Sequence, residues 1–144
     1  MIVSKYKNVK TTDADYTLNT VYTVLRVTFG LVPIVAGLDK FTNLLTRWED
    51  YLNPVILNII PVSGQTFMKI VGIIEIIAGI IVLVKPSTGA YIVMAWLICI
   101  ALNLITSGKF FDVAVRDLVM AIAAFSLGKI AQFEASRNSQ MQTA

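Results

Sequence analysis

The sequence predicts an all-α integral membrane protein, a four-helix bundle with up-down-up-down topology and a short interfacial or re-entrant segment between spans 1 and 2. Two observations predict this fold class. Of the 144 residues, 56% are hydrophobic and only 15% are charged, and the mean hydropathy is +0.73, so lipid is the expected solvent. Four apolar runs also approach the roughly 20 residues that a helix needs to cross a bilayer.

These runs divide the chain into three parts. A polar N-terminal segment covers residues 1–19, a four-transmembrane-helix domain covers residues 20–131, and a polar tail covers residues 132–144. The four spans are expected at residues 21–41, 67–84, 90–106 and 111–130. Because the tail is polar and terminal, we expect it to be disordered.

The connections between the spans differ in length. Between spans 1 and 2, the apolar stretch of residues 51–61 is too short to cross a membrane, and it contains two prolines. Trp48 and Tyr51 are suited to anchor this connection at headgroup depth. A tight turn, KPSTG at residues 85–89, is expected to join spans 2 and 3.

The number of spans predicts the topology. Four spans place both termini on one side of the membrane, and the N-terminal segment lacks the apolar core of a cleaved secretory signal. The termini and the 85–89 turn carry six Lys and Arg residues, against five in the opposite loops. The positive-inside rule therefore favours a cytoplasmic location for both termini.

Missing residue types exclude several classes of function. The chain has no His, which excludes imidazole ligation of haem b, iron, copper or zinc. A single cysteine, Cys99, excludes intrachain disulfides, CxxC redox pairs and iron–sulfur clusters. The net charge of +3 is scattered, whereas nucleic-acid binding needs clustered basic residues. We therefore expect a lipid bilayer and other membrane subunits as partners, but no nucleic acid, metal or haem.

Polar residues in the first span share one helical face. Arg26, Gly30, Pro33, Gly37 and Lys40 are separated by 4, 3, 4 and 3 residues, a spacing that keeps them together on a helix. The two glycines allow another backbone to approach closely. This face is therefore predicted to pack against another helix.

The second span carries the complementary face. Gly72, Glu75 and Gly79 lie on one side of the run VGIIEIIAGIIVLV. A carboxylate in a hydrocarbon-spanning segment is costly and faces inward, so the two glycine faces are expected to meet. Because arginine holds a carboxylate bidentately, Arg26 or Arg116 is the expected partner of Glu75. Two roles for Glu75 remain open here, namely helix pairing and binding of a ligand or proton.

A second polar layer is expected nearer the membrane surface. Asp39 and Lys40 end span 1, and Arg116 and Asp117 lie near the start of span 4, so the four could form an ionic layer. Asn103 and Thr106 of span 3 could supply neutral hydrogen bonds to it. The predicted polar centre therefore comprises Arg26, Asp39, Lys40, Glu75, Asn103, Arg116 and Asp117, and the helix-packing residues are Gly30, Gly37, Gly72 and Gly79.

Three stretches together resemble the DoxX family of small four-span membrane proteins. They are LRVTFGLVPIVAGLDKF, GIIEIIAGIIVLVKPSTGAYIVM and FFDVAVRDLVMAIAAFSLGK, and the likeness covers residues 20–131. The matching features are an early Arg and a Gly followed by Lys in span 1, G-x-x-E-x-x-x-G in span 2, and charged residues opening span 4. The resemblance implies a four-helix bundle in the bacterial cytoplasmic (inner) membrane, where some relatives are subunits of a quinone-linked oxidoreductase and others associate with oxidative-stress enzymes.

Three functions are compatible with these observations. The first is a non-catalytic accessory subunit of a larger respiratory or redox membrane complex, which the short loops and small-residue faces favour. The second is a quinone-linked subunit of a DoxX-type oxidoreductase, although no motif in the chain supports a quinone site. The third is a small proton-coupled transporter in which Glu75 titrates. No residue is predicted to be catalytic, and no cofactor is required.

Overall fold

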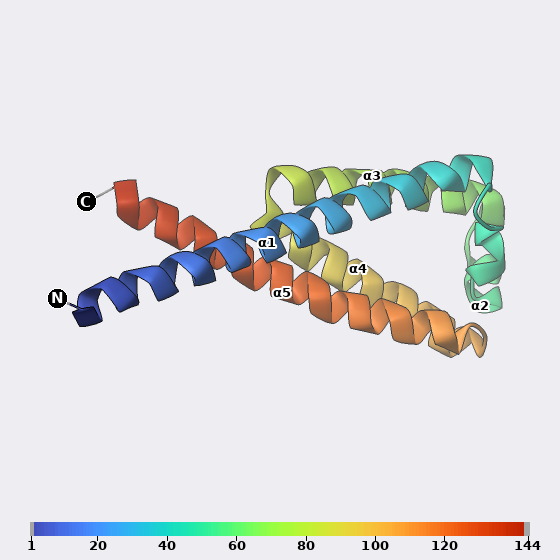
Figure 1. Ribbon diagram of the computed structural model, residues 1–144. Helices are drawn as coiled ribbons and strands as arrows, with labels where there is room; N and C mark the ends of the chain where they lie inside the picture. The colour runs from blue at the N-terminus through green and yellow to red at the C-terminus, as the bar shows by residue number, and fades with distance from the viewer. Residues whose placement is uncertain (1, 143–144) are drawn as a thin grey trace.

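The computed structural model describes the backbone of residues 2–142 and the side chains of residues 13–140. Within this range the chain is entirely helical apart from its loops, which confirms the all-α prediction. The elements are α1 (Ile2–Thr42), the 3-10 helix η1 (Trp48–Tyr51), α2 (Pro54–Ile59), α3 (Gly64–Val84), α4 (Pro86–Ser107) and α5 (Phe111–Gln142). The four long helices pack as a bundle (Figure 1).

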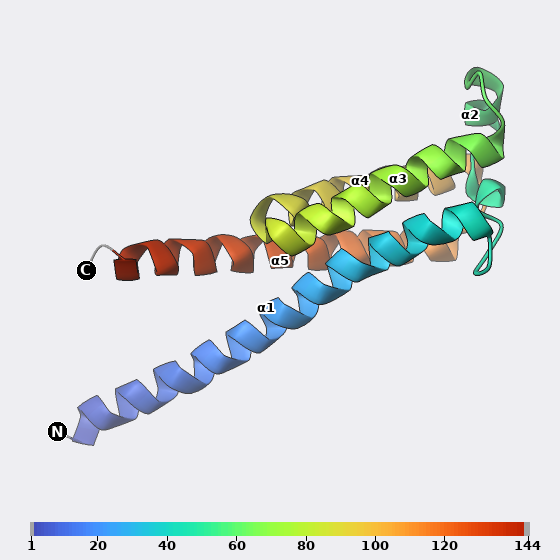
Figure 2. The ribbon, with the colours of Figure 1, turned by 90° about the horizontal axis from the view of Figure 1, so that it is seen from above.

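The bundle consists of two antiparallel helix pairs, α1 with α3 and α4 with α5 (Figure 1). Successive long helices run in opposite directions, and both chain ends lie at the same end of the molecule, which we call the termini end. The short helix α2 lies across the opposite end, which we call the α2 end. The first part of α1 and the last part of α5 project beyond the other helices (Figure 2).

Three helical segments are long and apolar enough to cross a membrane, namely Asp13–Thr42, Gly64–Val84 and Pro86–Ser107. At about 1.5 Å per residue, the 21 residues of α3 extend roughly 30 Å, which matches the hydrocarbon core. By length and hydropathy the chain is a multi-pass membrane protein. The helix α5 begins at Phe111 as predicted but is not among the three.

The chain is more helical than predicted near both of its termini. The helix α1 extends through the polar N-terminal segment, and α5 continues to Gln142. The prediction of a disordered tail is therefore wrong for residues 132–142, while residues 143–144 lie outside the described chain. Arg137 donates to Asp15 at 2.8 Å, so the two projecting helices are joined by an ion pair.

The connection between α3 and α4 is shorter than the predicted 85–89 turn. Only Lys85 separates the two helices. Pro86 can occupy the first helical position because that residue needs no intrahelical N–H bond. Gly89 lies in the first turn of α4, where an added Cβ would be 2.5 Å from the Val82 backbone. This close approach is what allows the tight hairpin.

Small side chains fill the centre of the bundle. The core cluster joins α3, α4 and α5 with one aromatic residue of α1, and its fully or nearly fully buried members are Phe29, Ala78, Val82, Ala90, Val93, Leu97, Ala121, Ala124 and Leu127. Large apolar side chains such as Ile77 and Ile122 are instead exposed on the outer faces. An apolar exterior around a small-residue interior is the arrangement expected in lipid.

Candidate functional site

The candidate site is a buried ion pair between α1 and α3, near the α2 end. Lys40 Nζ lies 2.5 Å from Glu75 Oε2, and the two side chains are 3% and 8% exposed. The prediction that Arg26 or Arg116 pairs with Glu75 is therefore wrong. An ammonium and a carboxylate so deeply buried neutralise each other, because either charge alone would be strongly disfavoured in lipid.

The register of α1 and α3 explains why lysine is the partner. An added Cβ at Gly37 would lie 2.5 Å from the Gly72 carbonyl oxygen, and one at Gly72 would lie 2.6 Å from that of Gly37, so the backbones touch there. Lys40 and Glu75 each lie three residues beyond this contact, in opposite directions. Side chains lean toward the N-terminus of their own helix. In antiparallel helices the two side chains therefore lean toward each other and close an axial offset of roughly 9 Å.

Two tryptophans complete the surroundings of the pair. The Lys40 ammonium lies 3.6 Å from the centre of the Trp48 ring, which is a cation–π contact. On the other side, Trp96 of α4 directs its indole N–H toward Glu75 Oε1 at 3.4 Å. Both carboxylate oxygens and the ammonium thus have a partner in the chain itself. The sequence indicated Trp48 only as an interfacial anchor, and it gave no indication of Trp96.

Asp39 holds the loop that follows α1. Its carboxylate accepts hydrogen bonds from the Trp48 indole at 2.7 Å and from the backbone N–H groups of Leu44 and Leu45 at 2.9 and 3.1 Å. It therefore fixes the ring that covers Lys40. The predicted ionic layer with residues 116 and 117 is not formed, because Asp39 bonds to its own loop.

Asn103 and Thr106 anchor the next part of the connection to α4. Asn103 donates to the Tyr51 carbonyl at 2.8 Å and accepts from the Asn53 N–H at 3.2 Å. The Asn53 amide donates to Thr106 Oγ1 at 3.1 Å and also caps α2 by accepting from Val55 N–H. Asn103 thus binds the loop backbone and Thr106 binds the Asn53 side chain, and neither belongs to an ionic layer.

The remaining predicted site residues lie elsewhere. Arg26 donates through Nε and Nη2 to the carbonyl of Leu83, so it caps the last turn of α3 at the termini end. Arg116 pairs with Asp112 at 2.8 Å, and both side chains are about two-thirds exposed. Asp117 is half-buried within electrostatic range of Glu75, and it has no hydrogen bond or ion pair with any other residue in the range 13–140.

An exposed pair in the loop contrasts with the buried one. Arg47 donates to Glu49 Oε1 at 2.9 Å, with side chains 71% and 39% exposed. This bond, together with the nearby Asp50 carboxylate, raises the pKa of Arg47. Such solvated pairs contribute little to stability.

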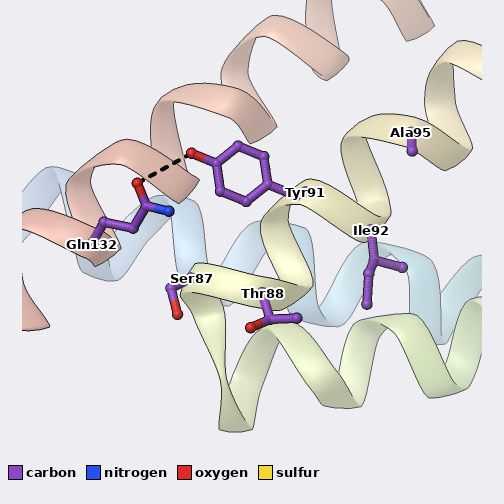
Figure 3. Close-up of a pocket in the computed structure, with 6 residues that line it drawn as sticks. All are labelled: Ser87, Thr88, Tyr91, Ile92, Ala95 and Gln132. Atoms are coloured by element: carbon purple, nitrogen blue, oxygen red, sulfur yellow. Dashed lines mark hydrogen bonds between the residues drawn. The ribbon is translucent and has the colours of Figure 1, made fainter.

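Two cavities lie away from the ion pair, at the termini end. One is a groove on α4 and α5 near the bond from Tyr91 Oη to Gln132 Oε1 (Figure 3). The other lies where α1 and α5 pass the α3–α4 turn and is lined in part by Arg26, Lys85 and Glu134. Neither cavity includes Lys40 or Glu75.

The ion pair and its tryptophans form a polar centre in which each charged atom has a partner in the chain. No group of three His, Cys, Asp or Glu side chains capable of holding a metal is found in the described part of the chain. Cys99 is exposed on α4. Comparison of the chain with protein-family models, curated proteins and solved structures finds no match.

Proposed function

We propose that this small membrane protein is a non-catalytic accessory subunit, with the Lys40–Glu75 pair serving as an internal lock between α1 and α3. The observation that carries the proposal is that Lys40 and Glu75 find their bonding partners within the chain itself. Glu75 Oε2 meets Lys40, Glu75 Oε1 meets Trp96, and the ammonium also meets the Trp48 ring. Each charged atom of the pair already has a partner in its own chain, so none of them needs a substrate to neutralise it.

The projecting helices support a role in assembly. The first part of α1 and the last part of α5 extend past the bundle (Figure 2), where Arg137 joins Asp15. Phe133 on this part of α5 is 51% exposed. A helical pair that stands outside the membrane and carries an exposed aromatic residue is suited to contact another subunit.

The helix α5 is proposed as the fourth span. It begins at Phe111 and packs on α4 along the buried residues Ala121 and Ala124, and its outer face presents Val115 and Ile122. Asp112 and Arg116 at its start would then lie at the membrane surface. In this arrangement both termini share one side, which we propose to be the cytoplasmic side of a bacterial inner membrane.

Kinship with the DoxX family is also a proposal. It is supported by the order of the features rather than by any one of them: Lys40 at the end of the first long helix, Glu75 between two glycines in the second, and charged residues opening the last. A quinone-linked or proton-coupled role would need the Lys40–Glu75 pair to open and exchange partners. The accessory role requires the pair to stay closed.

Isolation from native membranes tests the proposal. A photo-crosslinking amino acid at position 133, near the projecting helices, is expected to link the chain to another protein. The same amino acid at position 44, in the loop at the α2 end where Leu44 is 84% exposed, is the matched control and is expected to give no such product. Recovery of the chain alone from gentle detergent, with no crosslink from position 133, would contradict the accessory role.

A further inference from the structure

The two cavities at the termini end differ in polarity and adjoin each other. The polar cavity has a volume of about 510 Å³ and is lined by Asn19, Tyr22, Arg26, Lys85, Ser87, Glu134 and Asn138 together with four apolar residues. The neighbouring groove has a volume of about 490 Å³ and runs along α4 past Tyr91, Ile92 and Ala95. Ser87 lines both. Both are open to the surface rather than enclosed, so a ligand there would remain partly exposed.

The polar cavity offers both signs of charge. The Lys85 ammonium has no ion pair or hydrogen bond with any residue in the range 13–140, and Arg26 Nη1 is likewise unbonded there, since only Nε and Nη2 reach Leu83. These groups together favour a phosphate.

Glu134 supplies the opposite charge. Its Oε1 atom is buried and has no hydrogen-bond donor among the described residues, and the nearest cation, Arg137 Nη1, is 3.6 Å away and already donates to Asp15. A buried carboxylate oxygen without a donor is costly. Glu134 lines the cavity and its side chain is 19% exposed, so a ligand N–H group there can donate to its carboxylate.

The depth of the cavity identifies the kind of ligand. The membrane-spanning segments of α3 and α4 meet at Lys85, so the polar cavity lies at headgroup level and the groove lies within the hydrocarbon. Figure 3 shows Ser87 and Thr88 at the first turn of α4, with Tyr91, Ile92 and Ala95 following along the helix. A polar head at Lys85 and an acyl chain along Ile92 would occupy both cavities at once.

We propose that this end of the protein binds a phospholipid whose headgroup carries an ammonium with N–H donors, of the ethanolamine type. The phosphate lies against Lys85 and Arg26, the ammonium donates to Glu134, and one acyl chain lies in the groove beside Tyr91 and Ile92. Choline lipids carry the same phosphate and chains but no N–H donor, so the site discriminates against them.

Native mass spectrometry of the full chain in mild detergent tests this proposal, with ethanolamine and choline phospholipids of identical acyl chains offered together. The wild type is expected to retain the ethanolamine lipid about tenfold over the choline lipid, since one charge-assisted hydrogen bond distinguishes them. E134Q is expected to bring that ratio to about one. Equal retention by the wild type, or an unchanged ratio in E134Q, would overturn the proposal.

Further variants test the contacts of the lipid headgroup and of the acyl chain separately. K85Q removes no contact among the described residues, and it is expected to weaken the binding of both lipids about threefold to tenfold. The control K109Q at the α2 end is expected to leave the binding of both lipids unchanged. A95F fills the groove and is expected to weaken both lipids without altering their ratio. Displacement of the lipid by an equal concentration of soluble phosphoethanolamine would contradict the acyl-chain part, as would full lipid retention by A95F.

Discussion

The charged side chains are arranged differently at the two ends of the bundle. At the α2 end, Lys40 and Glu75 are almost completely buried and bond to each other. At the termini end, Lys85 and Glu134 line an open cavity and do not meet. Lys40 and Glu75 lie on the facing sides of two antiparallel helices, so their side chains lean together. Lys85 lies instead in the connection between α3 and α4, and Glu134 lies on α5. Buried charges that pair with each other stabilise the fold, whereas charged side chains around an open cavity can bind a ligand.

The largest effect is expected from removing one member of the closed pair. Glu75→Gln or Lys40→Met leaves the other charge buried without a counter-ion, and each is expected to lower the free energy of unfolding by about 3–5 kcal/mol. Equilibrium unfolding in detergent measures this loss. A loss below about 1 kcal/mol, the range of exposed pairs, would show that the pair is not closed in the folded protein.

The glycine contact between α1 and α3 is the next feature to disturb. A Cβ at position 79 would collide with the Gly30 backbone carbonyl, whereas a Cβ at position 30 would meet only the Leu83 side chain. Gly79→Ala is therefore expected to destabilise by about 1–3 kcal/mol, and Gly30→Ala by less, because a side chain can move aside more easily than a backbone. Thermal unfolding of the two variants gives the comparison. The reverse order would show that the α1–α3 register is different.

The loop at the α2 end should respond to Asn103. Asn103→Leu removes its bonds to Tyr51 and Asn53 and is expected to destabilise by about 1–2 kcal/mol. Hydrogen exchange should become faster in residues 51–57 while the α1–α3 contact keeps its protection. Unchanged exchange in this loop would mean that α4 does not anchor it.

The smallest effect is expected at the exposed pair that opens α5. Arg116→Gln breaks only a solvated bond to Asp112, so its effect on unfolding should stay within about 0.5 kcal/mol. The same unfolding assay used for Glu75→Gln provides the comparison. A loss as large as that of Glu75→Gln would place Arg116 in the polar centre after all.

The sequence predicted the helices better than the contacts between them. Long apolar runs identified α3 and α4 within a few residues, whereas α1 and α5 extend well beyond the predicted spans. The spacing of Gly37, Lys40 and Glu75 identified the faces that pack. The partner of Glu75 could not be predicted in this way, because residue counting gives only a rough depth for each side chain, and the chemical preference for arginine then favoured the wrong cation. The backbone contacts of Gly37 with Gly72 and of Gly79 with Gly30 fix the relative heights of the two helices, and they depend on both helices together.

Hydrogen bonds from side chains to the loop backbone could not be predicted from the sequence either. Asp39 and Asn103 were expected in an ionic layer, but they hold the loop, because its free N–H and C=O groups must be bonded somewhere. Loop N–H groups such as that of Leu44 are present in every sequence, so no pattern of side chains reveals them. Trp96 shows the same difficulty, since its apolar neighbours conceal that its indole N–H reaches Glu75.

A double-mutant cycle on Lys40 and Glu75 tests the central claim most directly. Unfolding free energies are measured for Lys40→Met, Glu75→Gln, the double variant, and the matched cycles of Glu75→Gln with Arg26→Gln and Arg116→Gln. If the pair is closed, the double variant of Lys40 and Glu75 should lose at least about 2 kcal/mol less stability than the sum of the two single variants. The two arginine cycles should be additive within about 0.5 kcal/mol. Additive losses for Lys40 and Glu75, or coupling of Glu75 to either arginine, would contradict the claim.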